Sequence, residues 1–176
     1  MVRAFVGITI PEDIKRYVVG IQEQLKSLPI KAKFVEIENL HISLSFLGEV
    51  TDEELETIKL TLDGISESYE KFESILSDIL LIPNENFVRV IVLDVKSDTL
   101  ESIRKEIVKK VGGESDPAHL TLGRVSNIID KRKFIEGIGS ILCNELPFII
   151  DSMCLIKSKL GKPGPVYTIL NKSYLK

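Results

Sequence analysis

Tryptophan is absent from this 176-residue sequence, which has only two cysteines, two histidines and no apolar run long enough to span a membrane. The longest apolar stretches, around residues 87–95 and 148–156, are interrupted by charged residues, whereas a membrane-spanning helix needs about 20 apolar residues. The apolar start at residues 2–10 is too short for a signal peptide and is followed at once by Pro11 and two acidic residues. We therefore expect a cytoplasmic protein that does not enter a membrane.

The few cysteines and histidines also bear on metal binding. Cys143 and Cys154 lie in apolar segments and lack C-x-x-C spacing, so we expect reduced, mostly buried thiols. Two histidines and two distant cysteines offer no recognised zinc-ligand spacing, and we expect neither a metal nor a cofactor. The net charge of −3 excludes a strongly basic protein that coats itself in nucleic acid.

Length and composition are those of an ordinary globular chain. At about 150 residues per domain, residues 1–176 are expected to form a single domain, and a chain of this length can bury a core without disulfides or a structural metal. Hydrophobic residues make up 44% and charged residues 28% of the chain, far from the composition of disordered proteins. No heptad pattern or exposed apolar run predicts assembly, so we expect a monomer.

The apolar spacing alternates along the chain between the period of helices and that of strands. Ile14, Val18 and Ile21 recur at helical spacing, and Thr51 with Glu54 forms a capping-box pattern at the start of a second helix. The patterns predict helices at 11–27, after Thr51, at 98–111 and near 130–142, and strands at 3–10, 40–48, 72–81, 87–95, 119–124, 147–158 and 165–171.

The order of these elements repeats. The strand–helix–strand–helix unit that starts at Arg3 is followed by a second such unit that starts at Phe87, and each has a histidine at the start of its second strand. We expect an α+β fold of two similar lobes, each a mainly antiparallel sheet with helices, related by a pseudo-twofold axis around a central cleft. A doubly wound parallel sheet is the alternative, but frequent hairpin signals favour antiparallel sheets.

The two histidines lie in matching four-residue segments, His41-Ile42-Ser43-Leu44 and His119-Leu120-Thr121-Leu122. Each segment has a hydroxyl residue two positions after the histidine. In a strand, residues i and i+2 point to the same face, so each imidazole is expected to lie beside a hydroxyl. A single histidine on a strand is most often a surface residue or a core residue, but two with matching contexts in matching units indicate a site.

Two imidazoles and two hydroxyls around one cleft suit a particular chemistry. Histidine titrates near neutral pH, so one ring can act as a general base and the other as a general acid. Hydroxyls donate hydrogen bonds to an anion without adding charge. Hydrolysis or transfer at a phosphodiester needs all of these groups, and the pattern therefore indicates a phosphodiester substrate.

These segments resemble those of the two-histidine phosphoesterases, in particular the RNA 2′,3′-cyclic phosphodiesterases, also called the LigT-like or 2′-5′ RNA ligase family. The resemblance covers nearly the whole chain. It is carried by residues 3–8, by the segment 38–50 around the first histidine, by the segment 117–124 around the second, and by 164–167 near the C-terminus. A two-lobed fold with one motif on each side of a cleft is implied.

The resemblance also implies a role for individual residues. His41 is expected to donate a proton to the leaving ribose oxygen, and His119 to accept one from water, so that an RNA 2′,3′-cyclic phosphate becomes a 2′-phosphate. Ser43 and Thr121 are expected to bind the phosphate oxygens. The family usually has threonine in the first motif, so Ser43 is a departure that keeps the hydroxyl and loses a rotamer-restricting methyl. Reversible 2′-5′ RNA ligation is also implied.

Four further residues are expected to contact the substrate. Phe46 would stack on a base and Arg124 would recognise phosphate, while Arg3 and Tyr167 are weaker candidates. Simple alternation places Phe46 and Arg124 on the face opposite their histidines. Gly123 permits a β-bulge that would redirect Arg124, but no local cause is evident for Phe46, and a place in the core is its alternative.

Two other functions stay open from the sequence. One is a non-catalytic module that binds RNA ends or nucleotides in the same cleft, which would use the hydroxyls without needing both imidazoles. The other is a phosphodiesterase of the same superfamily that acts on a different small cyclic phosphate.

Overall fold

The chain contains nine strands, four α-helices and one short 3-10 helix. A computed structural model describes all 176 residues. The elements are β1 (Val2–Thr9), α1 (Glu12–Lys26), β2 (Ile30–Phe34), the short 3-10 helix η1 (Ile37–Asn39), β3 (His41–Val50), α2 (Asp52–Ser66), β4 (Phe72–Asn84), β5 (Phe87–Lys96), α3 (Asp98–Val111), β6 (His119–Ile128), α4 (Lys131–Ser140), β7 (Leu146–Ile150), β8 (Ser152–Lys159) and β9 (Val166–Tyr174).

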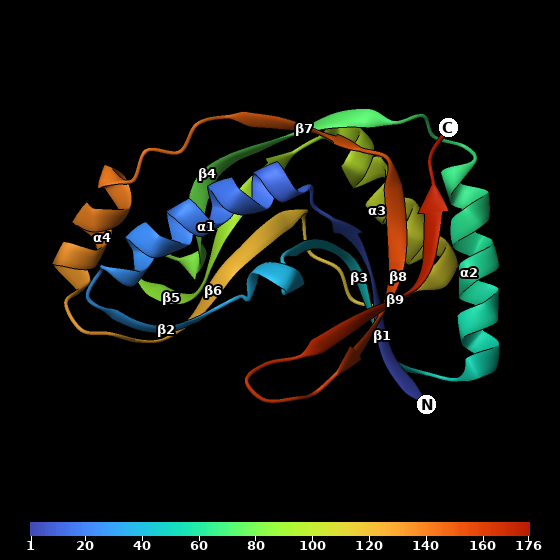
Figure 1. Cartoon of the computed structure of the whole chain (residues 1–176), viewed down its shortest axis with the longest axis horizontal. Coiled ribbons are helices and arrows are strands. Elements are labelled where there is room, and N and C mark those ends of the chain that lie inside the picture. Colours follow the sequence, from blue (N-terminus) through green and yellow to red (C-terminus); the bar gives the residue numbers. More distant parts are fainter.

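Eight of the strands follow one another in the order β7-β4-β5-β6-β3-β1-β8-β9, and β2 pairs with β6 beside this path. All pairings are antiparallel, which confirms the antiparallel prediction. The two histidine strands, β3 and β6, meet in the middle through one residue pair only, Ile42 with Leu120. The sheet is therefore divided there into two lobes, β3-β1-β8-β9 and β6-β5-β4-β7 (Figure 1).

The two lobes are equivalent strand by strand, as the repeated order in the sequence predicts. β1 and β3 of one lobe correspond to β5 and β6 of the other, and each histidine begins the corresponding strand. Two helices exchange lobes: α1 follows β1 but packs against β2 and β6, whereas α3 follows β5 but packs against β3. In Figure 1, α1 and α4 lie over one lobe and α2 and α3 over the other. A core of 33 buried residues consequently extends through both lobes.

Local signals begin and end the helices, and the predicted capping box is one of them. The Thr51 hydroxyl accepts from the Glu54 backbone amide, and the Glu54 carboxylate accepts from the Thr51 amide at 2.7 Å, which completes the capping box of α2. Ser97 accepts from the Leu100 amide at the start of α3. That helix ends at Gly112, whose φ of +91° lies in the region that favours glycine.

Two predictions about the strands were wrong. The sequence did not predict β2, whose edge position leaves its lysines exposed and its other side chains half-buried. The single strand predicted at 147–158 is two strands, because the chain passes from one lobe to the other at Asp151: β7 pairs with β4, whereas β8 pairs with β1 and β9. None of the helices has the length and apolar character needed to cross a membrane.

Candidate active site

Both histidine strands have a β-bulge at the same position, three residues after the histidine. On β3 the partners of Val6 and Gly7 are Ser45 and Ser43, so Leu44 is the extra residue. On β6, Ile91 and Val92 pair with Gly123 and Thr121, and the extra residue is Leu122. A bulge reverses the alternation of side chains beyond it. The fifth residue after each histidine is therefore turned to the same face as the histidine.

These bulges direct Phe46 and Arg124 toward the site. The predicted bulge beside Gly123 is confirmed, and the same feature in β3 supplies the local cause that the sequence did not reveal for Phe46. The alternative of a core position for Phe46 was wrong, because 48% of this residue is exposed. The bulge does not itself require glycine, since Ser45 occupies the equivalent position in β3, but a Cβ at Gly123 would lie only 3.0 Å from the Phe34 side chain.

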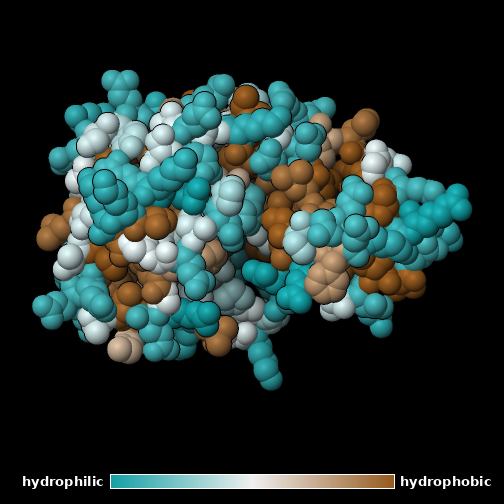
Figure 2. Space-filling view, turned by 180° about the vertical axis from the view of Figure 1, so that it is seen from behind, coloured by the Kyte–Doolittle hydropathy of each residue, from teal (hydrophilic) through white to brown (hydrophobic).

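The side chains meet in two adjoining cavities between the lobes. The first has a volume of about 210 Å³ and is lined by His41 and Tyr167, among others. The second, of about 140 Å³, is lined by His119. Residues common to both are Ser43, Phe46, Thr121 and Arg124. The two imidazoles thus lie on either side of a shared group of hydroxyls and one guanidinium. From behind, the space-filling surface is hollowed between the lobes (Figure 2).

His41 has a partner at each ring nitrogen. Its Nδ1 lies 2.6 Å from the carbonyl oxygen of Asn39, and its Nε2 lies 2.9 Å from the Ser43 hydroxyl. Because a carbonyl only accepts, Nδ1 carries a hydrogen and Nε2 faces Ser43 and the cavity. The rings of Phe5 and Tyr167 lie 4.8 and 5.3 Å from the imidazole, centroid to centroid.

This enclosure changes the titration of His41. Burial lowers the pKa of His41 below its ordinary value of 6.5, because burial disfavours the charged ring. The hydrogen bond to Asn39 acts in the opposite direction, and the charge of His119 adds to the lowering. A phosphate anion bound beside Ser43 would favour the protonated ring, so the protonation of His41 depends on what the cavity holds.

His119 is oriented in the same way as His41. Its Nδ1 donates to the carbonyl oxygen of Pro117 at 2.8 Å, again two residues before the histidine. Its Nε2 is left for the cavity. Both rings therefore have Nδ1 occupied and Nε2 free to exchange a proton, and each lines a cavity that contains the shared hydroxyls. One neutral Nε2 can accept a proton while a protonated Nε2 on the other ring donates one.

Tyr167 and Arg3, the two weaker candidates, lie in different places. Tyr167 contacts His41 edge-on in the first cavity, and burial raises the pKa of its hydroxyl while Arg124 acts in the opposite direction. Arg3 lines neither cavity. It lies in a neighbouring groove of about 730 Å³ that shares Phe46, Arg124 and Tyr167 with the site. Contact between Arg3 and a ligand thus requires a ligand that extends out of the histidine cavities.

Three residues that the sequence analysis did not select hold the site together. The side-chain amide of Asn39 donates to the Pro165 carbonyl at 2.8 Å, and Lys33 Nζ donates to the Pro163 carbonyl, so the loop before Tyr167 is held at the rim. The third is Gln22 on α1, whose amide reaches carbonyls of Val35 and Leu122. The sequence did contain a signal for Gln22, because this polar residue lies four residues after Val18, on the apolar face of its helix.

Comparison with known proteins agrees with this geometry. A family model described as LigT like phosphoesterase matches residues 8–92. A protein of Methanothermobacter thermautotrophicus is 35% identical, over 95% of both chains. One of Methanocaldococcus jannaschii is 38% identical, over 97% of this chain and 99% of its own. Both are named RNA 2′,3′-cyclic phosphodiesterase.

Solved structures share the fold. A crystal structure from Thermus thermophilus has a TM-score of 0.85 and 22% identity, and the match covers 98% of this chain and 97% of that one. Escherichia coli LigT complexed with ATP has a TM-score of 0.76 and 20% identity, over 99% and 98% of the two chains. Two equivalent lobes with one histidine strand each define the class of two-histidine phosphoesterases. Within it, this chain belongs to the LigT-like phosphoesterase family.

Proposed function

We propose that the protein hydrolyses RNA 2′,3′-cyclic phosphate ends to 2′-phosphates, with His41 and His119 as the catalytic acid and base. The observation that carries the proposal is the pair of imidazoles, one from each lobe, whose Nδ1 atoms are held by backbone carbonyls and whose cavities share the Ser43 and Thr121 hydroxyls. Support also comes from the relatives named RNA 2′,3′-cyclic phosphodiesterase. Those names do not favour a non-catalytic module or a different cyclic phosphate.

In the proposed mechanism, His119 Nε2 accepts a proton from water, and the resulting oxygen nucleophile attacks phosphorus. The bond from phosphorus to the ribose 3′ oxygen breaks, and protonated His41 donates its Nε2 proton to that oxygen. The phosphate stays on the 2′ oxygen. Each proton transfer by a positioned side chain contributes about 10²- to 10⁴-fold in rate.

Six further side chains complete the site in this proposal. The hydroxyls of Ser43 and Thr121 donate to the non-bridging phosphate oxygens, and the Arg124 guanidinium balances their charge. Phe46, exposed at the mouth of both cavities, stacks on a base. Tyr167 packs against His41, and Arg3 contacts RNA that continues into the neighbouring groove.

The proposal also covers the cofactor requirement, the oligomeric state and the cellular location of the protein. The acid and base are both imidazoles, so the mechanism needs no metal or cofactor. A monomer holds the whole site, since both lobes come from one chain of a single domain, residues 1–176. Both cysteines are free thiols, as in proteins of a reducing compartment, which supports a cytoplasmic location. With an RNA 5′-hydroxyl in place of water as the nucleophile, the same groups would form a 2′-5′ linkage as the P–O3′ bond breaks, and cleavage of that linkage would be the reverse reaction.

A short RNA with a 2′,3′-cyclic phosphate, incubated with the protein in excess chelator, tests the proposal. We expect a 2′-phosphate product, identified against 2′- and 3′-phosphate standards. A 3′-phosphate product, or full activity of His119→Ala, would contradict the mechanism. Faster turnover of a cyclic mononucleotide than of the RNA would favour a small cyclic phosphate. Tight RNA binding by the double His→Ala variant, without wild-type turnover, would favour a binding module.

A further inference from the structure

The segment 112–118, which connects α3 to β6, lies against the other histidine strand. Phe46 and Glu114 exchange backbone hydrogen bonds of 2.7 and 2.9 Å, and the Ser45 hydroxyl donates to the Gly112 carbonyl at 2.6 Å. On the edge away from β1, β3 beyond its bulge is thus paired by this segment and not by β6. The backbone position of Phe46 depends on where this segment lies.

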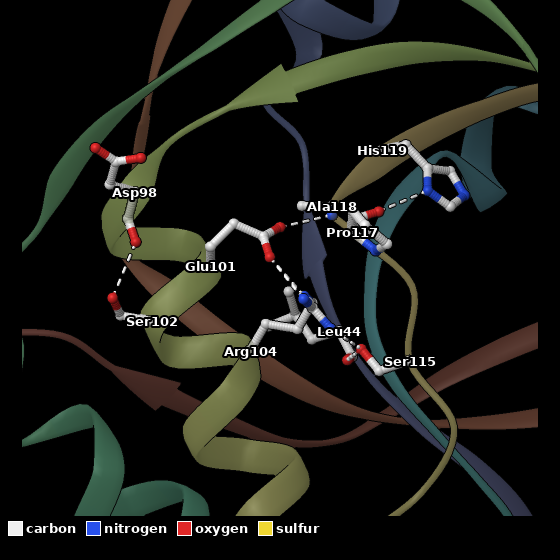
Figure 3. A network of polar contacts seen from close by, with 9 residues as sticks. All are labelled: Leu44, Asp98, Glu101, Ser102, Arg104, Ser115, Pro117, Ala118 and His119. Atoms are coloured by element: carbon white, nitrogen blue, oxygen red, sulfur yellow. Dashed lines mark hydrogen bonds and ion pairs between the residues drawn. The ribbon is translucent and has the colours of Figure 1, made fainter.

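An ion pair on α3 holds the segment in place (Figure 3). One carboxylate oxygen of Glu101 accepts from the backbone amide of Ala118 at 2.7 Å. The other accepts from Arg104, whose Nε and Nη2 lie 2.8 and 2.7 Å away. The remaining Nη1 of Arg104 donates to the Ser115 hydroxyl at 2.9 Å. The pair is largely shielded from solvent, with 13% of the Arg104 side chain and 29% of the Glu101 side chain exposed.

The contacts continue to both halves of the site. The Ser115 hydroxyl donates at 2.6 Å to the carbonyl of Leu44, the extra residue of the β3 bulge. At the other end, Pro117 precedes Ala118, and its carbonyl accepts the Nδ1 hydrogen of His119 (Figure 3). One ion pair is therefore connected to the bulge that turns Phe46 and to the carbonyl that orients His119.

We propose that Glu101 and Arg104 are positioning residues, which act through the segment 112–118 on His119 and Phe46. Neither touches the cavities, and neither is part of the two histidine motifs. Arg104 suits this position because a planar guanidinium reaches a carboxylate and a hydroxyl at once, which a lysine ammonium at the end of a flexible chain does not. The consequence for catalysis rests on the proposed function, whereas the orientation of the His119 ring does not.

Three variants separate the two branches. Arg104→Met removes the donor to Ser115 and leaves the Glu101 carboxylate, which holds the Ala118 amide, without its cation. We expect loss of the Nδ1–H preference of the His119 ring together with a fall in kcat of about 10-fold or more, since small misplacements of catalytic groups are costly. Glu101→Gln removes the charge that holds Arg104 but keeps an acceptor for Ala118, so its effects are smaller. Ser115→Ala cuts the branch to Leu44. Because Ser115 also lines the second cavity, this variant is judged by KM and by the His119 ring: KM should rise while the tautomer of the ring stays unchanged.

The matched controls are Glu56→Gln and Lys59→Met, which break an ion pair of the same i,i+3 spacing on α2, 2.6 Å long and away from the site. Ring tautomers are measured by ¹⁵N NMR, and with two histidines in the chain the spectra contain only two imidazoles. A folded Arg104→Met protein that keeps the wild-type His119 tautomer and kcat would overturn the proposal, and so would equal changes in the α2 controls. If Arg104→Met does not fold, an unchanged His119 ring in Glu101→Gln overturns it.

The ring spectra do not depend on turnover. They decide the positioning role even if the wild-type protein does not act on RNA, in which case only the proposed function fails.

Discussion

The side-chain amide of Gln22 on α1 donates to the carbonyl of Leu122, 100 residues further along the chain, at 2.9 Å. Leu122 is the extra residue of the β6 bulge, and its equivalent on β3, Leu44, receives the Ser115 hydroxyl. Each repeat of the chain thus supplies the donor for the bulge in the other repeat. Neither lobe can complete its half of the site alone, because the group that holds its bulge comes from the opposite repeat.

Replacing Gln22 by leucine should lower the free energy of unfolding by about 1–3 kcal/mol. The change removes the two hydrogen bonds that the Gln22 amide donates to backbone carbonyls, and the Val35 carbonyl loses its side-chain donor. Gln22 is 4% exposed, so water does not replace the lost bonds. Urea unfolding measures the change. Gln24→Leu, the same substitution on the exposed side of α1, should stay within about 0.5 kcal/mol of wild type. Equal losses in the two variants would contradict the role given to the Gln22 amide.

The architecture was predictable because its signals are local. The spacing of Ile14, Val18 and Ile21, the capping box at Thr51 and the alternation after each histidine all depend on neighbours in the chain. Both motifs lie where a strand places the imidazole and the hydroxyl on one face. The repeated order of elements then indicates two lobes without any knowledge of their contacts.

The features that were not predicted depend on distant contacts. The β3 bulge is held by Ser115, so nothing near Phe46 reveals it. The short segment that forms β2 contains two lysines, and it is a strand because it pairs with β6. The break at Asp151 is hidden because the residues on both sides are apolar, although they pair in different lobes.

Phe46→Leu should raise KM for an RNA substrate about 5-fold or more with little change in kcat, because base stacking on an aromatic ring is worth about 1–3 kcal/mol. The matched control is Phe87→Leu, which removes another exposed ring, 58% accessible and outside both cavities. Steady-state kinetics on one oligonucleotide compare the two. A loss in kcat alone for Phe46→Leu would contradict a role in binding.

Arg124→Met should lower kcat/KM more than Phe46→Leu does, because the guanidinium lines both cavities and its charge is opposite to that of the phosphate. We expect a loss of about 100-fold, in the range measured when one donor to a developing oxyanion is removed. Arg89→Met, on the neighbouring strand and outside both cavities, is the control. Similar kinetics for the two variants would exclude phosphate recognition by Arg124.

The pH dependence of the reaction should differ between the free and the substrate-bound protein. As the proposed acid, His41 must be protonated, and burial lowers the pKa of His41 below 6.5 in the free protein. Since kcat/KM reports the free enzyme, it should fall with rising pH from below 6.5. Bound phosphate favours the imidazolium, so the alkaline fall in kcat should lie at higher pH. Alkaline limbs of kcat and kcat/KM at the same pH would contradict the assignment of His41 as the acid.

The same lowered pKa has a consequence for stability that does not require substrate. Between the folded pKa of His41 and its unfolded value of 6.5, the unfolded chain binds a proton that the folded protein does not, so the free energy of unfolding falls as the pH is lowered through this range. His41→Asn lacks the titrating ring and should lose this part of the pH dependence. Urea unfolding of both proteins at a series of pH values between about 7 and 5 measures it. Parallel stability curves for the two would mean that His41 is not held neutral by its burial against Phe5 and Tyr167.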